Sequence, residues 1–173
     1  MDGRRWLVCG VILGMIPSSA WAEKARAIIA GTKAGVPVAG TVILEDTKEG
    51  LKVDAEITQA PAGLHAFHIH EFGACGDEGG AAGSHYNPGG HPHGDVMKGG
   101  VEMVHAGDFG NLTVGDDGKA SLHAVVPGLT LSYGKYSVAG RAFILHEKAD
   151  DFSQPVGNAG SRIGCGPILL TKE

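Results

Sequence analysis

The sequence predicts an all-β domain of about eight short antiparallel strands that form a sandwich or barrel. The chain has 173 residues, of which 29 are glycine without a collagen period, and 43% are hydrophobic. It therefore has many turns and enough apolar side chains for one core. No window has the apolar spacing of an amphipathic helix, whereas several short segments alternate polar and apolar residues.

The strands of the amino-terminal half are the clearest. Residues 52–58 alternate polar and apolar side chains without a break, as expected of a strand with one buried face. A glycine-containing turn at 48–50 precedes them. Residues 26–30 and 40–45 are predicted to be the first two strands, and 64–70 the fourth.

The carboxyl-terminal half contains further strands and two long loops. Residues 115–118 (GDDG) are a strong hairpin signal between strands at 111–114 and 119–125. The apolar runs 136–146 and 163–170 are predicted to be the last two strands. Residues 73–107 and 147–160 fit no strand, and structureless loops of such length are uncommon unless they have a function.

The amino terminus has the order of a secretory signal peptide: a basic pair (Arg4 and Arg5), an apolar run over 6–16, and the small-x-small sequence 20–22. The run is too short to span a bilayer. We expect cleavage after Ala22, so that residues 1–22 are the signal peptide and 23–173 the mature domain. The alternatives are a buried helix and, because of Cys9, a lipoprotein, for which Val8 is a poor match.

Charge and cysteine content narrow the function further. The formal net charge is −5 and there is no Lys/Arg cluster, so a nucleic-acid partner is not expected. Removal of the signal leaves no segment for stable membrane insertion, and it removes Cys9. The remaining pair, Cys75 and Cys165, indicates one disulfide in an exported protein.

Histidines are the residues most indicative of a metal site. His68 and His70 would point to the same face of a strand, although an ordinary solvent face would look the same. The long loop adds four histidines, Asp108 follows them, and a later strand ends at His146; imidazole suits zinc and copper, and a carboxylate favours zinc. The plainer alternative is a His/Gly loop that binds metals loosely. His65 and His123 lack this context and are expected at the surface. The loop histidines are His85, His91, His93 and His105.

Five segments, in order along the chain, resemble the copper/zinc superoxide dismutases. They are residues 64–73 (LHAFHIHEFG), 82–88 (AGSHYNP), 105–111 (HAGDFGN), 146–151 (HEKADD) and 157–166 (GNAGSRIGCG). The resemblance implies an eight-stranded Greek-key barrel with two long functional loops. It also implies dismutation of superoxide to dioxygen and hydrogen peroxide, by alternate reduction and reoxidation of a copper ion that a histidine bridges to zinc.

The resemblance assigns roles residue by residue. Arg162 would dock superoxide, Asp150 would link a copper ligand to a zinc ligand, and Cys75 would pair with Cys165. For the remaining zinc histidine the chain offers His91 and His93; spacing from the bridging residue and the following glycine favour His93. The implied copper ligands are His68, His70, His85 and His146, and the implied zinc ligands are His85, which is the bridge, His93, His105 and Asp108.

The sequence departs from the family pattern in features that bear on the subtype of the enzyme and on electrostatic steering of its substrate. The position of Cys75 is that of many bacterial enzymes, so we expect an exported, periplasmic-type member, with secretion as the alternative. The second loop is short, and Val156 stands where a threonine often lines the channel. Superoxide is the expected partner, and a homodimer is allowed.

Three other interpretations are weaker, because every copper and zinc position and Arg162 are present. They are a metal-sequestering protein, a non-catalytic binding module, and a copper-only dismutase.

Overall fold

The computed structural model describes residues 22–172, so the predicted signal peptide lies outside the described residues except for Ala22. Strands dominate, and the only helical segments in this part of the chain are a 3-10 turn η1 (Gly80–Ala82) and a single-turn helix α1 (Val96–Gly99). The strands are β1 (Lys24–Gly31), β2 (Ala39–Thr47), β3 (Gly50–Gln59), β4 (Gly63–His70), β5 (Asp108–Val114), β6 (Ala120–Val126), β7 (Ala142–His146), β8 (Arg162–Pro167) and the short β9 (Leu169–Thr171).

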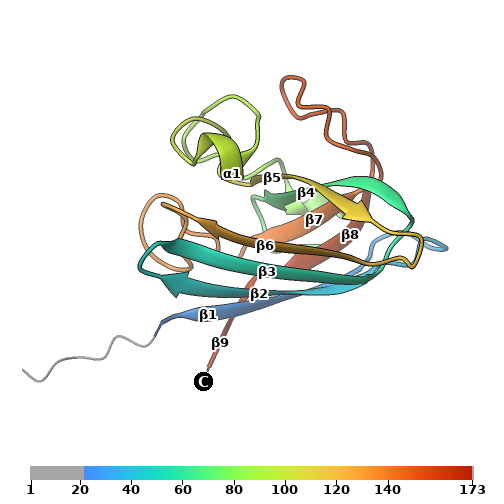
Figure 1. Cartoon of the computed structure of the whole chain (residues 1–173), viewed down its shortest axis with the longest axis horizontal. Coiled ribbons are helices and arrows are strands. Elements are labelled where there is room, and N and C mark those ends of the chain that lie inside the picture. The colour runs from blue at the N-terminus through green and yellow to red at the C-terminus, as the bar shows by residue number, and fades with distance from the viewer. Residues whose placement is uncertain (1–21, 173) are drawn as a thin grey trace, which may run out of the picture.

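The eight longer strands form one antiparallel sheet in the order β5-β4-β7-β8-β1-β2-β3-β6, and β9 pairs with β1. The end strands β5 and β6 are in contact, so the sheet is a nearly closed barrel (Figure 1). Several neighbours in space are not neighbours in sequence, such as β4 beside β7. The predicted all-β, eight-stranded class is confirmed.

The core follows from the alternation of side chains along the strands. In β3, Leu51, Val53, Ala55 and Ile57 are buried, while Lys52 and the other polar residues of the strand face outward. Stacked aromatic rings fill the centre, with Phe67 and Phe143 centroids 4.8 Å apart.

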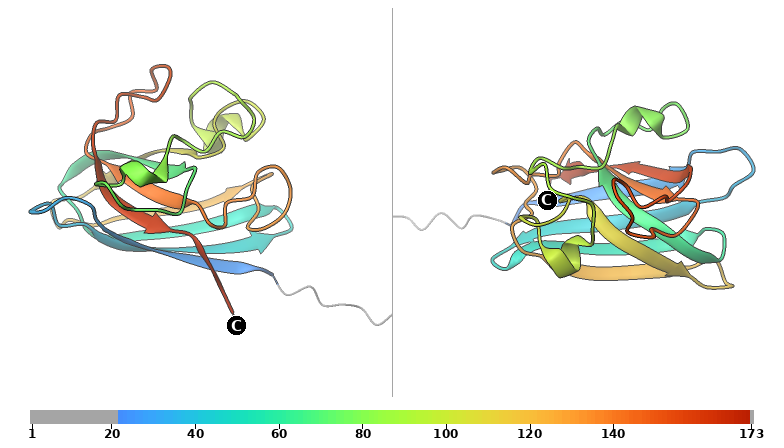
Figure 2. Two further views of the ribbon diagram at one scale, coloured as in Figure 1. Left: turned by 180° about the vertical axis from the view of Figure 1, so that it is seen from behind. Right: turned by 90° about the horizontal axis from the view of Figure 1, so that it is seen from above.

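Strand β4 departs from simple alternation because its last six residues are all buried. Phe67 and Ile69 belong to the core, whereas His68 and His70 lie on the other face. The two long loops lie on that side of the barrel (Figure 2). They replace solvent with protein around the histidines.

Two predicted strands are shorter in the structure. Within 136–146 only β7 is a strand, because Gly140 has a φ of 77° and ends an irregular stretch just before it. The run 163–170 divides into β8 and β9 at Ile168, whose N–H donates to the Arg141 carbonyl at 2.8 Å and whose carbonyl accepts from the Gly140 N–H at 2.9 Å, both just before β7.

A disulfide ties the long loop to the barrel. Cys75 and Cys165, which is in β8, are bonded, with their Cα atoms 5.7 Å apart. The predicted pairing is confirmed.

Within residues 22–172 no helix has the length and apolar character needed to cross a membrane.

Candidate metal centre

Six buried histidines and one buried aspartate converge between the barrel and the two loops. They form two groups of four that share His85, and within each group the potential ligand atoms lie within 4.8 Å of one another. The groups are His68, His70, His85 and His146, and His85, His93, His105 and Asp108.

The first group contains only imidazoles, which come from β4, β7 and the start of the long loop. The Nε2 atoms of His70 and His146 are 3.3 Å apart, and the rings of His68 and His85 have centroids 4.2 Å apart. His70 donates from Nδ1 to the Gly83 carbonyl at 2.9 Å, so its Nε2 lone pair faces the group. Burial lowers the pKa of His70 to about 2 and that of His146 to about 3, so both rings are neutral and able to act as ligands.

The second group is built around the Asp108 carboxylate. Its oxygens lie 2.8 Å from His85 Nδ1 and 3.1 Å from His105 Nδ1, and His93 Nδ1 is also adjacent. Burial alone would raise the pKa of Asp108, but hydrogen bonds with His105, His85 and His93 outweigh it and lower the pKa below its usual range. Three imidazoles and a carboxylate are a typical donor set for zinc.

Asp150 connects the two groups from outside. One carboxylate oxygen is 2.9 Å from His68 Nε2, and the other is 2.9 Å from His93 Nε2. Burial would raise the pKa of Asp150, but these two hydrogen bonds lower it. Each ring therefore donates from Nε2 to Asp150 and turns Nδ1 toward the centre. Asn111 fixes Asp150 by accepting from its backbone N–H at 2.7 Å and donating to its carbonyl at 2.9 Å.

The donor atoms fit the two metals that the sequence predicted. The Nδ1 atom of His68 is buried and has no hydrogen-bond partner among residues 22–172, and the buried Nδ1 atoms of His93 and His105 face only the Asp108 carboxylate. Buried polar atoms are rarely left unpaired, so these nitrogen lone pairs indicate a bound cation. Neutral imidazoles suit copper, and the set that includes Asp108 suits zinc.

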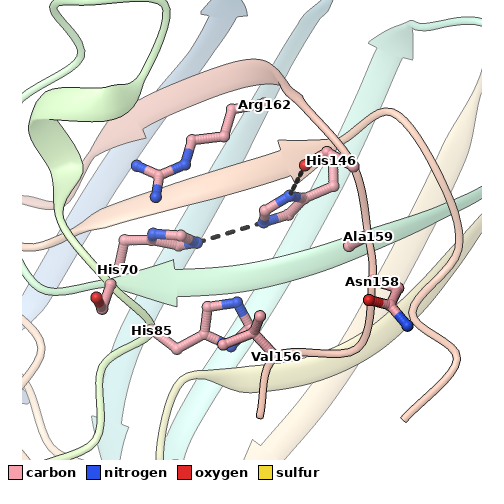
Figure 3. Close-up of a pocket in the computed structure, with 9 residues that line it drawn as sticks. His70, His85, His146, Val156, Asn158, Ala159 and Arg162 are labelled. Atoms are coloured by element: carbon pink, nitrogen blue, oxygen red, sulfur yellow. Dashed lines mark hydrogen bonds between the residues drawn. The ribbon is translucent and has the colours of Figure 1, made fainter. Parts of the chain in front are cut away.

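Arg162 lies beside the first group in an open pocket of about 450 Å³, which His70, His85 and His146 also line. Figure 3 shows its guanidinium on the same side of the pocket as His70 and His146, with Val156 and Asn158 across from them. Arg162 donates to the carbonyls of Gly79 and Gly83, each at 2.6 Å. The loop thus holds a permanent cation at the pocket wall.

The structure separates His91 from His93. His93 joins the second group, whereas His91 belongs to none of the metal-type groups found among residues 22–172. The His91 N–H donates to Asn87 Oδ1 at 3.0 Å, and the Asn87 amide donates to the His91 carbonyl at 2.9 Å. These bonds keep the His91 backbone within its own turn.

The surface prediction was wrong for His65. Its ring is 4% exposed, with Nδ1 2.8 Å from the His146 carbonyl and Nε2 2.9 Å from the Pro61 carbonyl. Two carbonyl partners make burial possible for a polar ring, although it lies near the start of β4. His123 is exposed as predicted and pairs with Asp54.

Sequence reasoning gave no specific role to Asn111 and did not single out Gln154. Asn111 belongs to the segment 105–111, and it holds Asp150. Gln154 lies in the second loop, and it bonds to the backbone of His93. Neither residue type carries a metal signal, and both partners are distant in sequence.

A nearly closed antiparallel barrel with two histidine groups that share one imidazole defines the class as a two-metal β-barrel protein. Residues 38–168 match the family model described as copper/zinc superoxide dismutase, so the chain belongs to this family. It is 37% identical over 160 residues to an extracellular superoxide dismutase (Cu-Zn) of Caenorhabditis elegans, in an alignment that covers 87% of this chain and 71% of that protein. A crystal structure described as that of the clock protein EA4 has a TM-score of 0.75 and 31% identity, and the match covers 87% of this chain and 96% of that one.

Proposed function

We propose that the pocket beside Arg162 is where this chain dismutates superoxide. As a member of the copper/zinc superoxide dismutase family, the chain is an oxidoreductase with copper and zinc as cofactors. In our proposal His68, His70, His85 and His146 hold copper, and His85, His93, His105 and Asp108 hold zinc. The observation that carries this assignment is that two buried donor groups share His85, and that the all-imidazole group opens into the pocket that Arg162 lines.

The chain's own residues would perform three tasks in the reaction. Arg162 binds the anionic substrate, since its guanidinium is always charged and presents a fork of donors. His85 has Nδ1 directed at Asp108, which leaves Nε2 on the pocket side, where it would hold either copper or a proton and would give that proton to the reduced oxygen. Asp150 keeps the rings of His68 and His93 in one orientation.

The bound metals would supply the rest of the chemistry: copper accepts and returns one electron, and zinc contributes fixed charge without redox activity. Over one cycle two superoxide anions and two protons give one dioxygen and one hydrogen peroxide. Because the chain has a net charge of −5, attraction of the substrate must be local and depends on Arg162.

Two ligand variants test the assignment of the groups. We expect His146→Ala to lose copper and keep zinc, and His105→Ala to lose zinc and keep copper, because each residue belongs to only one group. Metal content per chain, measured by mass spectrometry after loading with both ions, decides this. Copper retained at full occupancy by His146→Ala would contradict the proposal.

We also propose that the protein is exported, as a bacterial, periplasmic-type member, with secretion as the alternative. Support for export comes from the basic, apolar and small-residue order of residues 1–22 and from the Caenorhabditis elegans relative, which is described as extracellular. Support for the bacterial subtype is the position of Cys75. Amino-terminal sequencing of the exported protein should begin at Glu23. Retention of Met1 in that fraction would overturn the proposed cleavage after Ala22.

A homodimer is a further proposal. The outer face of β1, β8 and β9 exposes Ile28 and Leu169 beside Pro167, and such apolar residues favour association. Sedimentation equilibrium of the mature chain tests this: a mass of two chains is expected, and a single-chain mass at micromolar concentration would contradict it. No nucleic-acid partner is proposed, given the acidic net charge.

A further inference from the structure

His93 lies in a part of the long loop that has no regular secondary structure, between Gly90 and Gly94. Among the main-chain hydrogen bonds of residues 22–172, none outside the strands and helices involves His93. The backbone of this residue is nevertheless satisfied, because Gln154 of the second loop binds both of its polar groups. Gln154 Oε1 accepts from the His93 N–H at 2.9 Å, and Gln154 Nε2 donates to the His93 carbonyl at 3.0 Å.

This reciprocal pairing resembles one rung of a β-ladder, with a side-chain amide in place of the second strand. It fixes the peptide groups on both sides of the His93 Cα atom, and therefore limits rotation of the backbone that carries the ring. Pro92 already restricts the chain on one side, whereas Gly94 on the other side adds freedom. Gln154 thus supplies a constraint at the point where the local sequence is permissive.

The same loop also holds the His93 ring. Asp150 accepts from its Nε2 at 2.9 Å. The Phe152 ring stacks beside it, with centroids 6.3 Å apart and planes inclined by 23°. The Lys98 ammonium lies 5.7 Å from the centroid of Phe152 and pairs with Asp95, so the aromatic cover is itself held by the long loop. Residues 150–154 therefore contact His93 at its backbone and its ring.

We propose that Gln154 is a positioning residue for zinc, which presets the backbone of His93 so that its ring enters the His85, His105 and Asp108 group. The inference rests on the proposed function, in which His93 is a zinc ligand. Metal affinity depends on how much a ligand must be ordered when the ion binds, and groups that orient ligands typically contribute 10- to 100-fold to affinity. Because Gln154 is exposed and water competes for its hydrogen bonds, we expect an effect of about tenfold.

The test compares two equal chemical changes. Gln154→Met keeps the length of the side chain and removes both hydrogen bonds to His93. Gln59→Met makes the same change at the chain's other glutamine, which is exposed at the end of β3 and belongs to neither donor group. Zinc affinity is measured by competition with a chelator, the absorption spectrum is recorded with Co²⁺ in place of zinc, and the melting temperature of the apo protein is recorded for both variants.

We expect Gln154→Met to bind zinc about tenfold more weakly, to alter the Co²⁺ spectrum, and to match Gln59→Met in apo melting temperature. Zinc affinity equal to wild type would overturn the proposal. Weaker zinc binding by Gln154→Met would also overturn the proposal if its Co²⁺ spectrum were unchanged and its apo melting temperature fell below that of Gln59→Met. That pattern would be a general structural effect. His93→Ala separates the ligand role of His93 from the positioning role of Gln154. If His93→Ala keeps zinc, the ligand assignment is refuted. If His93→Ala loses zinc and Gln154→Met binds it normally, only the role of Gln154 is refuted.

Discussion

Replacement of Arg162 removes the cation of the proposed substrate pocket without removing a metal donor. At about 4 Å, an anion and a cation attract by about 4 kcal/mol at an effective dielectric constant of about 20. The pocket is open to water and Arg162 is half-buried, so we take about half of this value. A loss of about 2 kcal/mol corresponds to a fall of about 30-fold in kcat/KM for Arg162→Ala. Arg162→Lys keeps the charge but loses the forked contacts with Gly79 and Gly83, so its activity should be intermediate.

The assay is dismutation at subsaturating superoxide, measured at several ionic strengths with metal content determined on the same samples. Arg141→Lys is the matched control, because Arg141 also donates to a loop carbonyl, that of Glu71 at 2.7 Å, but does not line the pocket. We expect full copper and zinc in all three variants and near-normal activity in the control. The salt dependence should be weaker in Arg162→Ala, since a screened attraction has been removed. Unchanged kcat/KM in Arg162→Ala with full copper would refute the docking role.

Three further predictions follow from the loops. His93→Ala should release zinc while His91→Ala keeps it, and side-by-side zinc stoichiometry decides this; the opposite pattern would reverse the assignment. Replacing Cys75 and Cys165 by Ser should lower the free energy of unfolding of the apo protein, because the bond spans 90 residues. The chain-entropy model gives a loss of roughly 4–5 kcal/mol. A loss below about 1 kcal/mol in denaturant titrations would contradict that model. Gly157→Ala should displace Asp150 and weaken retention of both metals, since an added Cβ would lie 1.8 Å from Asp150 Oδ1. The control is Gly35→Ala, which is also at positive φ but has free space around the added Cβ. Equal metal retention in the two variants would argue against the role of Asp150.

Local pattern predicted the features that depend on neighbours in sequence. Alternation placed His68 and His70 on one face of β4 because side-chain direction in a strand follows residue parity. The same rule gave Val53, Ala55 and Ile57 as one buried face.

Features that depend on distant contacts could not be predicted in this way. His65 is buried because the carbonyls of Pro61 and His146 receive its ring, and the second of these is 81 residues away. The choice between His91 and His93 could be made from the sequence only by the resemblance. The physical basis for it is the approach of Asp108, Asp150 and Gln154 to His93.

The most direct test of the central claim is the metal content of the purified mature chain, together with its dismutation activity. We predict one copper and one zinc per chain, rapid dismutation in this form, and loss of activity when copper alone is removed and return when it is restored. A chain that carries both ions at full occupancy without accelerating superoxide decay, or that remains active after copper is removed, would contradict the account.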